Sequence, residues 1–200
     1  MELGAGARDR SKFIQLDIRD EETIGKHRDK IVKSFGGLDI LVNNAGIYQK
    51  PTPEDDKFPK QVKEILSTNY WGTKNVITAF YNDFKPNSRI VNITSNLAHV
   101  KSVVEPEQAK LKGIARERFS NARNLCELDG LVMKFQRDAN LGNWEREGWP
   151  TCAYSVSKMA INAFTRLFLT FYPKVVPLTH EHVSEFYNMT LTKQTGKMLS

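Results

Sequence analysis

A tyrosine four residues ahead of a lysine can act as a proton donor, and the chain has this spacing at Tyr70–Lys74, Tyr81–Lys85 and Tyr154–Lys158. On a helix, such residues lie about 5–6 Å apart at Cβ, so the ammonium can reach the phenol. At an effective dielectric of 20, a unit charge about 4 Å away contributes roughly 4 kcal/mol, which favours the phenolate. Catalysis also needs a desolvated cleft and an orienting hydrogen bond. The spacing alone therefore does not choose among the three pairs.

The local sequence argues against two of these pairs. Tyr81–Lys85 falls where a predicted helix runs into Pro86-Asn87, which is an exposed end. Tyr70–Lys74 lies in the middle of that helix, one position away from its apolar stripe. Tyr154–Lys158 instead opens a helix directly after Trp149-Pro150. We interpret the first two pairs as structural, whereas the position of the third leaves a catalytic and a surface role equally open.

Alternating strand and helix patterns must position these residues. The predicted strands are Phe13–Ile18, Leu38–Val42 and Arg89–Ser95, and the predicted helices are Glu21–Phe35, closed by two glycines, and a long helix from Val62 to Phe84. This order predicts an α/β fold in which helices cover both faces of a parallel sheet. The nearly continuous apolar run of Leu38–Val42 is typical of a strand that is buried on both faces.

In such sheets, ligands bind beyond the carboxyl ends of the strands. Asn43–Gly46 and Thr94-Ser95 both fall at that edge of the predicted sheet. Residues 105–148 are charged and mainly helical in pattern, so we interpret them as a helical insertion before the helix that carries Tyr154. Residues 1–171 then form one partial domain. Residues 172–200 contain a proline-flanked valine pair but no convincing strand, and they predict a poorly packed tail.

Composition restricts the function classes. The chain has 200 residues, 40% of them hydrophobic and 26% charged, which is ordinary for a globular domain. The net charge of +6 comes from basic residues scattered among 23 acids, so a solvated surface and an anionic cofactor explain it better than a nucleic-acid partner. No apolar run has membrane-spanning length and no secretory signal is visible, so we expect a cytoplasmic protein without a membrane partner. Cys126 and Cys152 are expected to be free thiols.

Four motifs in this order, "LVNNAG", "STNYWGT", "IVNITS" and "AYSVSK", resemble the short-chain dehydrogenase/reductase family. The resemblance covers roughly Phe13 to Leu169. The helical segment ahead of "EGWP" is similar to the monomeric carbonyl-reductase branch, which reduces ketones, aldehydes and quinones with NADPH. The resemblance implies a Rossmann-like sheet, a monomer and a small-molecule carbonyl substrate.

By position, the resemblance implies a catalytic tetrad of Asn69, Ser95, Tyr154 and Lys158. Tyr154 would protonate the carbonyl oxygen, and Ser95 would donate a hydrogen bond to that oxygen. Lys158 would activate the tyrosine and hold the nicotinamide ribose. Asn69 would hold a water for proton relay, with a core amide that satisfies backbone groups as the alternative.

The resemblance also implies a cofactor site and a substrate site. Asp17 and Ile18 would flank the adenine, and Asn44, Ala45 and Gly46 would line the floor beneath the cofactor, with Tyr154 and Lys158 beside it. Gln61 loosely matches a substrate-side position, next to Ser95 and Tyr154. The implied cofactor is NADPH, with NAD as the open alternative, and no metal is implied.

The amino-terminal sequence departs from the family pattern. The family begins with a strand, a glycine-rich turn and a helix whose amides hold the pyrophosphate. Here "LGAGAR" precedes a predicted strand, so the first two strands and the basic residue that selects NADP are missing. Losing two or three phosphate contacts would cost about 3–9 kcal/mol in cofactor binding. The alternative function is therefore a catalytically impaired, truncated chain of this type that acts as a binding or interaction protein.

Overall fold

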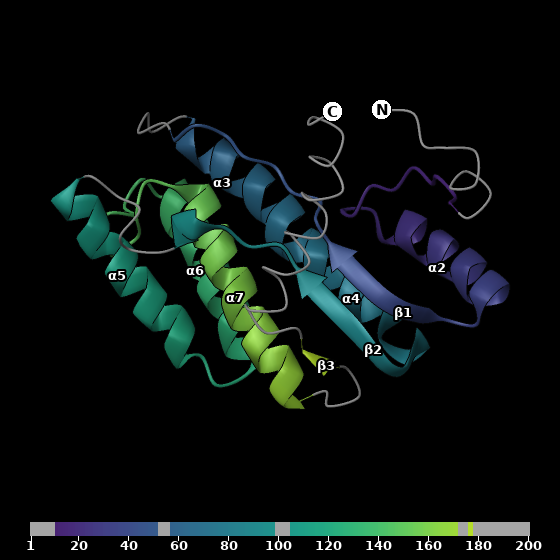
Figure 1. Ribbon diagram of the computed structural model, residues 1–200. Coiled ribbons are helices and arrows are strands. Elements are labelled where there is room, and N and C mark those ends of the chain that lie inside the picture. Colours follow the sequence, from purple (N-terminus) through teal and green to yellow (C-terminus); the bar gives the residue numbers. More distant parts are fainter. Residues whose placement is uncertain (1–10, 52–56, 99–104, 172–175, 178–200) are drawn as a thin grey trace, which may run out of the picture.

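The structure is a computed structural model that describes residues 11–51, 57–98, 105–171 and 176–177 (Figure 1). Its elements, in chain order, are α2 (Glu21–Phe35), β1 (Leu38–Asn43), α3 (Phe58–Leu66), the π-helical turn η1 (Ser67–Gly72), α4 (Thr73–Phe80), the 3-10 turn η2 (Tyr81–Asp83), β2 (Phe84–Asn92), the 3-10 turn η3 (Asn96–Ala98), α5 (Pro106–Asn121), α6 (Leu125–Asn140), α7 (Ala153–Phe171) and β3 (Val176–Pro177). Helices therefore alternate with the strands of one sheet.

The sheet is parallel and has the strand order β1-β2-β3. This confirms the predicted α/β class with an incomplete parallel sheet. Strand β3 pairs with Arg89 and Ile90 of β2. The expectation that no strand follows Phe171 was therefore wrong for two residues, because pairing with β2 supplies what the local pattern does not show. The remaining residues of the predicted tail lie outside the described residues.

The predicted strand at Phe13–Ile18 was wrong, because this segment forms no strand. Phe13 is 95% exposed. A strand needs a neighbour to complete its hydrogen-bond ladder. Within the described ranges, β1 is the edge of the sheet and pairs only with β2. No described strand therefore pairs with this apolar segment.

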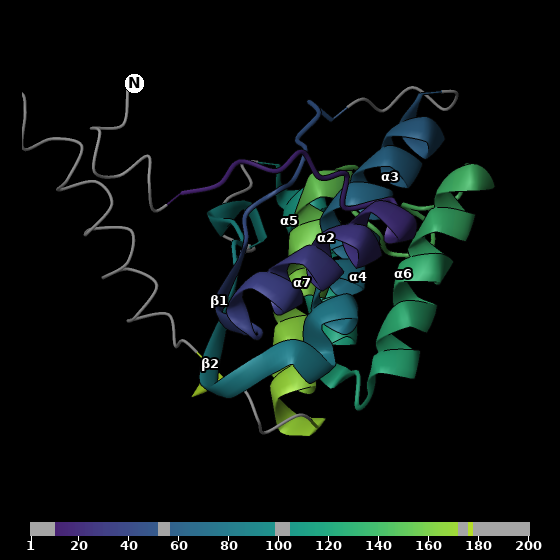
Figure 2. The ribbon, with the colours of Figure 1, turned by 90° about the vertical axis from the view of Figure 1, so that its right-hand side faces the viewer.

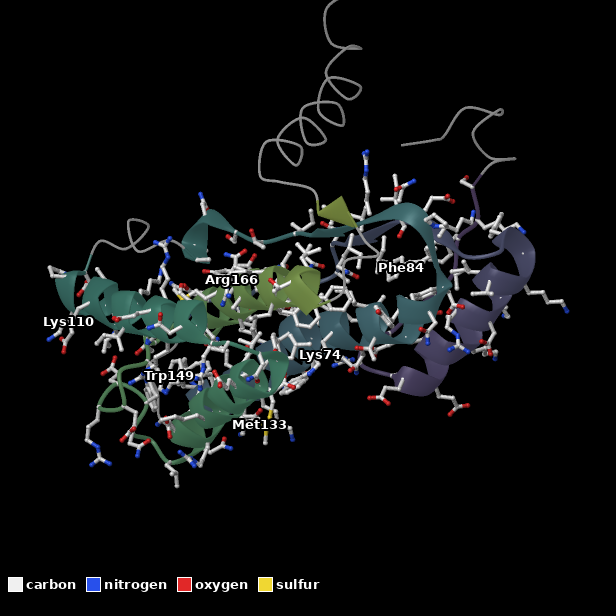
Figure 3. The ribbon with its side chains drawn as sticks, turned by 90° about the horizontal axis from the view of Figure 1, so that it is seen from below. Lys74, Phe84, Lys110, Met133, Trp149 and Arg166 are labelled. Carbon is white, nitrogen blue, oxygen red and sulfur yellow. The ribbon has the colours of Figure 1, made fainter. Side chains whose placement is uncertain are left out.

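The described helices all lie on one side of the sheet, as Figures 2 and 3 show from two directions. Strand β1 consequently has one open face, on which Ile40 is 50% exposed and Val42 is 41% exposed. The prediction that this strand is buried on both faces was wrong, and coverage by helices is seen on one face only among the described residues. A continuous apolar run does not by itself report how many layers surround a strand.

Helix α2 confirms its predicted bounds. The Asp20 side chain caps the first turn by accepting from the amides of Glu22 and Thr23. Gly36 ends the helix in the left-handed conformation, with φ of 72°, and its amide donates to the carbonyl of Val32. Both signals are local, which is why the sequence alone located this helix.

The predicted long helix is divided by a π-helical turn. Helix α3 ends at Leu66, the turn η1 follows, and α4 continues to Phe80. Strand β2 then begins at Phe84, so the predicted helix end at that residue was wrong. Within η1, Gly72 lies so close to Ile18 that a Cβ on the glycine would fall 2.8 Å from that side chain.

Helices α5 and α6 occupy most of the segment that precedes α7. Their core is aromatic, with Phe119, Phe135 and Trp149 fully or almost fully buried and packed ring against ring. The segment adds a second layer of helices beside α3 and α7.

Among the helices of the described residues, none combines the length and apolarity that crossing a bilayer requires.

Candidate active site

Helix α7 places Tyr154 and Lys158 on one of its faces. Tyr154 is half-buried, whereas Lys158 is only 6% exposed. The Lys158 ammonium donates to the carbonyl of Ile93 at 2.7 Å and lies 5.5 Å from the centroid of the Tyr154 ring. Burial lowers the pKa of Lys158. A desolvated ammonium beneath a tyrosine is the environment that the third Tyr–Lys pair needs for proton transfer.

Asn69 lies within the π-helical turn and is 1% exposed. Its oxygen accepts from the amide of Ile47 at 2.8 Å, and its nitrogen donates to the Ile47 carbonyl and to the Ser157 hydroxyl, both at 3.0 Å. The side-chain amide thus ties the loop after β1 to α7. This geometry matches the alternative reading of Asn69, a core amide that satisfies backbone groups, more closely than a side chain free to hold water.

Gly46 brings the loop after β1 against the same cluster. A Cβ at Gly46 would lie 3.2 Å from Oδ1 of Asn69 and 3.6 Å from Nζ of Lys158. The first contact is tighter than usual and the second is an ordinary van der Waals contact, so the backbone at Gly46 lies against both residues. The preceding Asn44 and Ala45 are exposed. The structure therefore brings Gly46, Asn69, Tyr154 and Lys158 together.

Ser95 lies just beyond the carboxyl end of β2, two residues after the carbonyl that receives Lys158. Its hydroxyl accepts from the amide of Leu97 at 3.2 Å. The carbonyl of Leu97 in turn accepts from Ser155 at 2.7 Å and from Lys112 at 3.1 Å. Burial lowers the pKa of Lys112. These two donors anchor the turn that carries Ser95 to α7 and α5.

Sequence reasoning missed Lys112 and Ser155 as supports of this turn. A lysine within a charged helical segment gives no sign that it is 4% exposed. It also missed that two strand-end asparagines link the sheet to α7, although it placed Asn43 at the ligand-binding edge. Asn43 donates to Asn92 at 2.8 Å, and Asn92 donates to Thr165 at 2.9 Å. The sequence feature that could have revealed them is that each of two apolar runs ends in an asparagine.

Tyr48 is a further residue that the motifs did not single out. Its ring is 57% exposed and meets the Tyr154 ring edge to face, with the centroids 5.1 Å apart. Its place two residues after Gly46 was the available signal. An exposed aromatic ring in contact with Tyr154 is a candidate contact for an aromatic ligand.

We expect Tyr48→Ala to raise KM for a substrate with an aromatic ring about three- to tenfold, because one aromatic contact contributes roughly 0.5–1.5 kcal/mol. Steady-state kinetics would measure KM. Tyr48→Phe is the matched control, because it keeps the ring and should have the KM of the parent. An unchanged KM in Tyr48→Ala would remove Tyr48 from the substrate site.

Asp17 and Ile18, the residues predicted to flank the adenine, are distant in sequence from the residues of this cluster. Asp17 is exposed and accepts from the amide, Nε and Nη2 of Arg19 at 2.8–3.0 Å. The Arg19 side-chain hydrogen bond, more than any other cause, lowers the pKa of Asp17 to about 2. The Ile18 side chain packs against Gly72. An acid held by an arginine at this turn was not anticipated from the sequence.

Gln61 is buried in α3 and does not face the solvent. It is 6% exposed, and its side-chain nitrogen donates to the carbonyl of Lys50 at 2.7 Å. Its oxygen has no hydrogen-bond partner within the described part of the chain. Gln61 therefore supports the segment after β1 at Lys50, and a direct substrate contact stays a prediction.

The other two Tyr–Lys pairs lack the surroundings of the third. The Tyr70 hydroxyl donates to Asp129 at 2.7 Å, and Lys74 forms an ion pair with the same carboxylate. Burial, followed by Asp129, raises the pKa of Tyr70, which opposes service as a proton donor. Tyr81 lies in η2 and Lys85 in β2, where Lys85 pairs with Asp39 at 2.8 Å. Both pairs are structural.

A parallel sheet that gathers Gly46, Ser95, Tyr154 and Lys158 beyond its strand ends defines a Rossmann-like dinucleotide-binding fold. A sequence model of the family described as short chain dehydrogenase matches residues 1–107. The chain therefore belongs to the short-chain dehydrogenase family.

Curated relatives include carbonyl reductase (NADPH) 1 of Macaca fascicularis, 39% identical over 161 residues, and carbonyl reductase (NADPH) 3 of Mus musculus, 39% identical over 163 residues. Each alignment covers 78% of this chain and 54% of the relative. The chain thus spans about half the length of the curated relatives that it matches.

Among solved structures, menthone neomenthol reductase from Mentha piperita is similar to this chain, with a TM-score of 0.67 and 28% identity. The match covers 81% of this chain and 67% of that chain. Salutaridine reductase from Papaver somniferum has the same TM-score at 25% identity. The similarity extends over most of the elements described above.

Proposed function

We propose that this chain reduces small carbonyl compounds (ketones, aldehydes and quinones) with NADPH, with Tyr154 as the general acid. The observation that carries the proposal is the buried Lys158 ammonium beneath Tyr154, beside a turn that presents Ser95. The names of the curated relatives support both the carbonyl substrate and the use of NADPH. We further propose that the protein acts as a monomer in the cytoplasm.

The roles follow from the chemistry of each side chain. Tyr154 protonates the oxygen of the carbonyl as negative charge develops on that oxygen. Ser95 donates a hydrogen bond to the same oxygen and so orients the substrate. The positive charge of Lys158 stabilises the phenolate that forms when Tyr154 releases its proton. Asn69 fixes the loop after β1 and thereby keeps Gly46 against Lys158.

The residues present fit a nicotinamide cofactor in two respects. The glycine at position 46 leaves room beside Asn69 and Lys158 that a Cβ would fill. An ammonium has three N–H donors, and Lys158 gives one of them to Ile93, so two are free for ribose hydroxyls among the described residues. Asn44, Ala45 and Gly46 would line the floor, with Asp17 and Ile18 towards the adenine. NADPH supplies the hydride when it is bound.

The experiment that tests the proposal is a fluorescence titration of the purified chain with NADPH. We expect a micromolar Kd that survives Tyr154→Phe and rises about tenfold or more in Lys158→Ala, because charge-assisted hydrogen bonds to the ribose are lost. Lys85→Ala is the matched control, since this lysine pairs with Asp39 at the opposite end of β1 and should leave the Kd unchanged.

Absence of binding at millimolar NADPH in all variants would overturn the proposal. That result would favour the alternative of a non-catalytic chain that keeps the tetrad and acts through binding or interaction. Circular dichroism of each variant would show that the comparison is made between folded proteins.

A further inference from the structure

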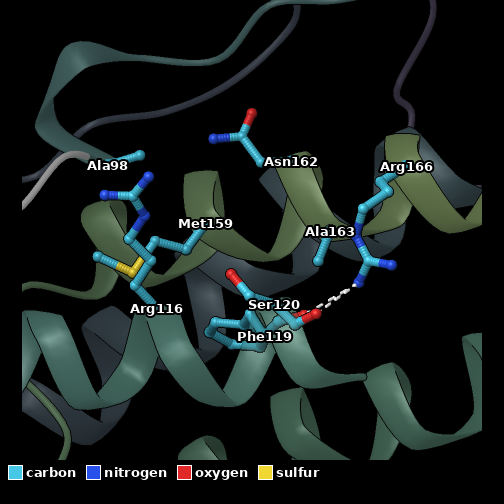
Figure 4. A pocket seen from close by; sticks show the side chains of 8 residues that line it. All are labelled: Ala98, Arg116, Phe119, Ser120, Met159, Asn162, Ala163 and Arg166. Atoms are coloured by element: carbon cyan, nitrogen blue, oxygen red, sulfur yellow. Dashed lines mark hydrogen bonds between the residues drawn. The ribbon is translucent and has the colours of Figure 1, made fainter. Parts of the chain in front are cut away.

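A pocket lies between α5 and α7, and it shares no residue with the site of Tyr154 and Lys158. Its volume is about 200 Å³. Figure 4 shows the side chains that line it, which are Ala98, Arg116, Phe119, Ser120, Met159, Asn162, Ala163 and Arg166.

The α7 residues of this pocket form their own stripe along the helix. Met159, Asn162, Ala163 and Arg166 follow the spacing i, i+3, i+4, i+7, which lines up on one helical face. At 3.6 residues per turn, this stripe is centred roughly a third of a turn away from Tyr154 and Lys158. The same helix therefore offers separate faces to the two sites.

The charge in this pocket is of one sign. Arg116 and Arg166 contribute two guanidinium groups, and none of the described lining residues carries a carboxylate. Arg116 is exposed and has no ion pair or hydrogen bond among the described residues. The pocket thus presents two positive charges that no acid of the described chain neutralises.

Arg166 is held in place at the other end of the pocket. Its Nη2 donates to the carbonyls of Phe119, Ser120 and Ala122 at 3.4, 3.1 and 2.9 Å, at the end of α5. A guanidinium has five N–H donors. Those on Nε and Nη1 of Arg166 have no acceptor among the described residues. The backbone contacts fix the guanidinium without cancelling its charge.

The rest of the lining is apolar and buried or carries a neutral polar group. Phe119, Met159, Ala98 and Ala163 are each at most 6% exposed and supply an apolar floor. Ser120 and Asn162 are exposed at the rim. A ligand that satisfies this lining needs an apolar body together with negative charge.

We propose that this pocket binds a small organic phosphate monoester, an apolar ring or short chain that carries one phosphate group. The phosphate fits because its negative charge matches the guanidinium of Arg116, which has no partner among the described residues, while Arg166 adds positive charge from the other end of the pocket. The apolar body fits because the floor is Phe119 and Met159. The inference does not rest on the proposed reductase function.

Phenyl phosphate is the probe, titrated into the full chain by isothermal calorimetry at low ionic strength. We expect saturable binding that weakens about tenfold in Arg116→Ala, since an exposed guanidinium contributes at the low end for charged hydrogen bonds. Asn162→Asp places a carboxylate at the rim and is expected to weaken binding at least as much. Lys110→Ala, an exposed charge on the same helix α5 but outside the pocket, is the matched control and should leave the affinity unchanged.

Four results would overturn the proposal. The first is no saturable binding, and the second is equal affinity in the parent and Arg116→Ala. The third is binding that disappears in Lys158→Ala, which would place the probe at the cofactor site instead. Inorganic phosphate and benzyl alcohol should each bind about tenfold or more weakly than phenyl phosphate. Inorganic phosphate binding as tightly as phenyl phosphate would also overturn it, because the apolar floor would then contribute nothing.

Discussion

Tyr154→Phe is expected to lower kcat for carbonyl reduction by about two to four orders of magnitude, which is the usual contribution of a positioned general acid. The substitution removes only the hydroxyl and keeps the ring that meets Tyr48 and lies over Lys158. The Kd for NADPH should therefore change little, so the loss should fall on kcat. Single-turnover kinetics with saturating NADPH and a quinone substrate would measure it.

Tyr81→Phe is the matched control for this prediction, because it makes the same change in a pair with the same spacing. The Tyr81 ring packs edge to face on Phe168, and phenylalanine keeps that contact. We expect its kcat to equal that of the parent. A Tyr154→Phe protein that retained at least half of the parent kcat would show that Tyr154 is not the proton donor.

Asp138→Ala is expected to lower the free energy of unfolding by about 2–4 kcal/mol. Asp138 is 2% exposed, and its Oδ2 accepts from the Trp149 indole at 2.8 Å and from Lys134 at 2.6 Å. Trp149 is fully buried, so alanine would leave its N–H donor unpaired in the core. Urea unfolding followed by circular dichroism would measure the change.

The same carboxylate predicts a dependence of stability on pH. Burial alone would raise the pKa of Asp138, but hydrogen bonds from Lys134 and Trp149 outweigh it, and the pKa lies below its usual value. Because the folded pKa is the lower one, this contribution is complete above the unfolded value of about 3.9. It is lost as the pH falls through the folded pKa below that value. Asp138→Ala should lack this part of the acid sensitivity.

Asp39→Ala is the control for the stability experiment. Its side chain is 75% exposed and pairs with Lys85, so its removal should cost less than about 1 kcal/mol. If Asp138→Ala were also within about 0.5 kcal/mol of the parent, the segment before α7 would not depend on this buried carboxylate.

The features that local signals encode were predictable from the sequence. Helix α2 carries its own start at Asp20 and its own end at Gly36, so its bounds needed no knowledge of the rest of the fold. The parallel pairing of β1 with β2 followed from the alternation of strands and helices. The strand predicted at Phe13–Ile18 failed because pairing depends on a distant neighbour that six residues cannot specify.

The candidate site was predictable in its residue types but not in its contacts. Spacing identified Tyr154 and Lys158 as a pair, yet only the fold shows that the ammonium is buried and reaches Ile93. Asn69 was recognisable as a polar residue on an apolar stripe, but its closure on Ile47 depends on a loop 22 residues away. Tyr48 was overlooked because exposed aromatic residues carry no periodic signal.

The π-helical turn Ser67–Gly72 has a consequence for which sequence changes this chain can accept. Before it, α3 packs against α6 and α7, and after it, α4 packs against α2. Each residue of an α-helix rotates the chain by about 100°, so adding or removing one residue here would turn one half of the segment away from its partners. Contacts already restrict the identity of Asn69, which holds Ile47, and of Gly72, which lies against Ile18. The six residues also set the relative orientation of two packing surfaces, so their number is constrained as well as their identity.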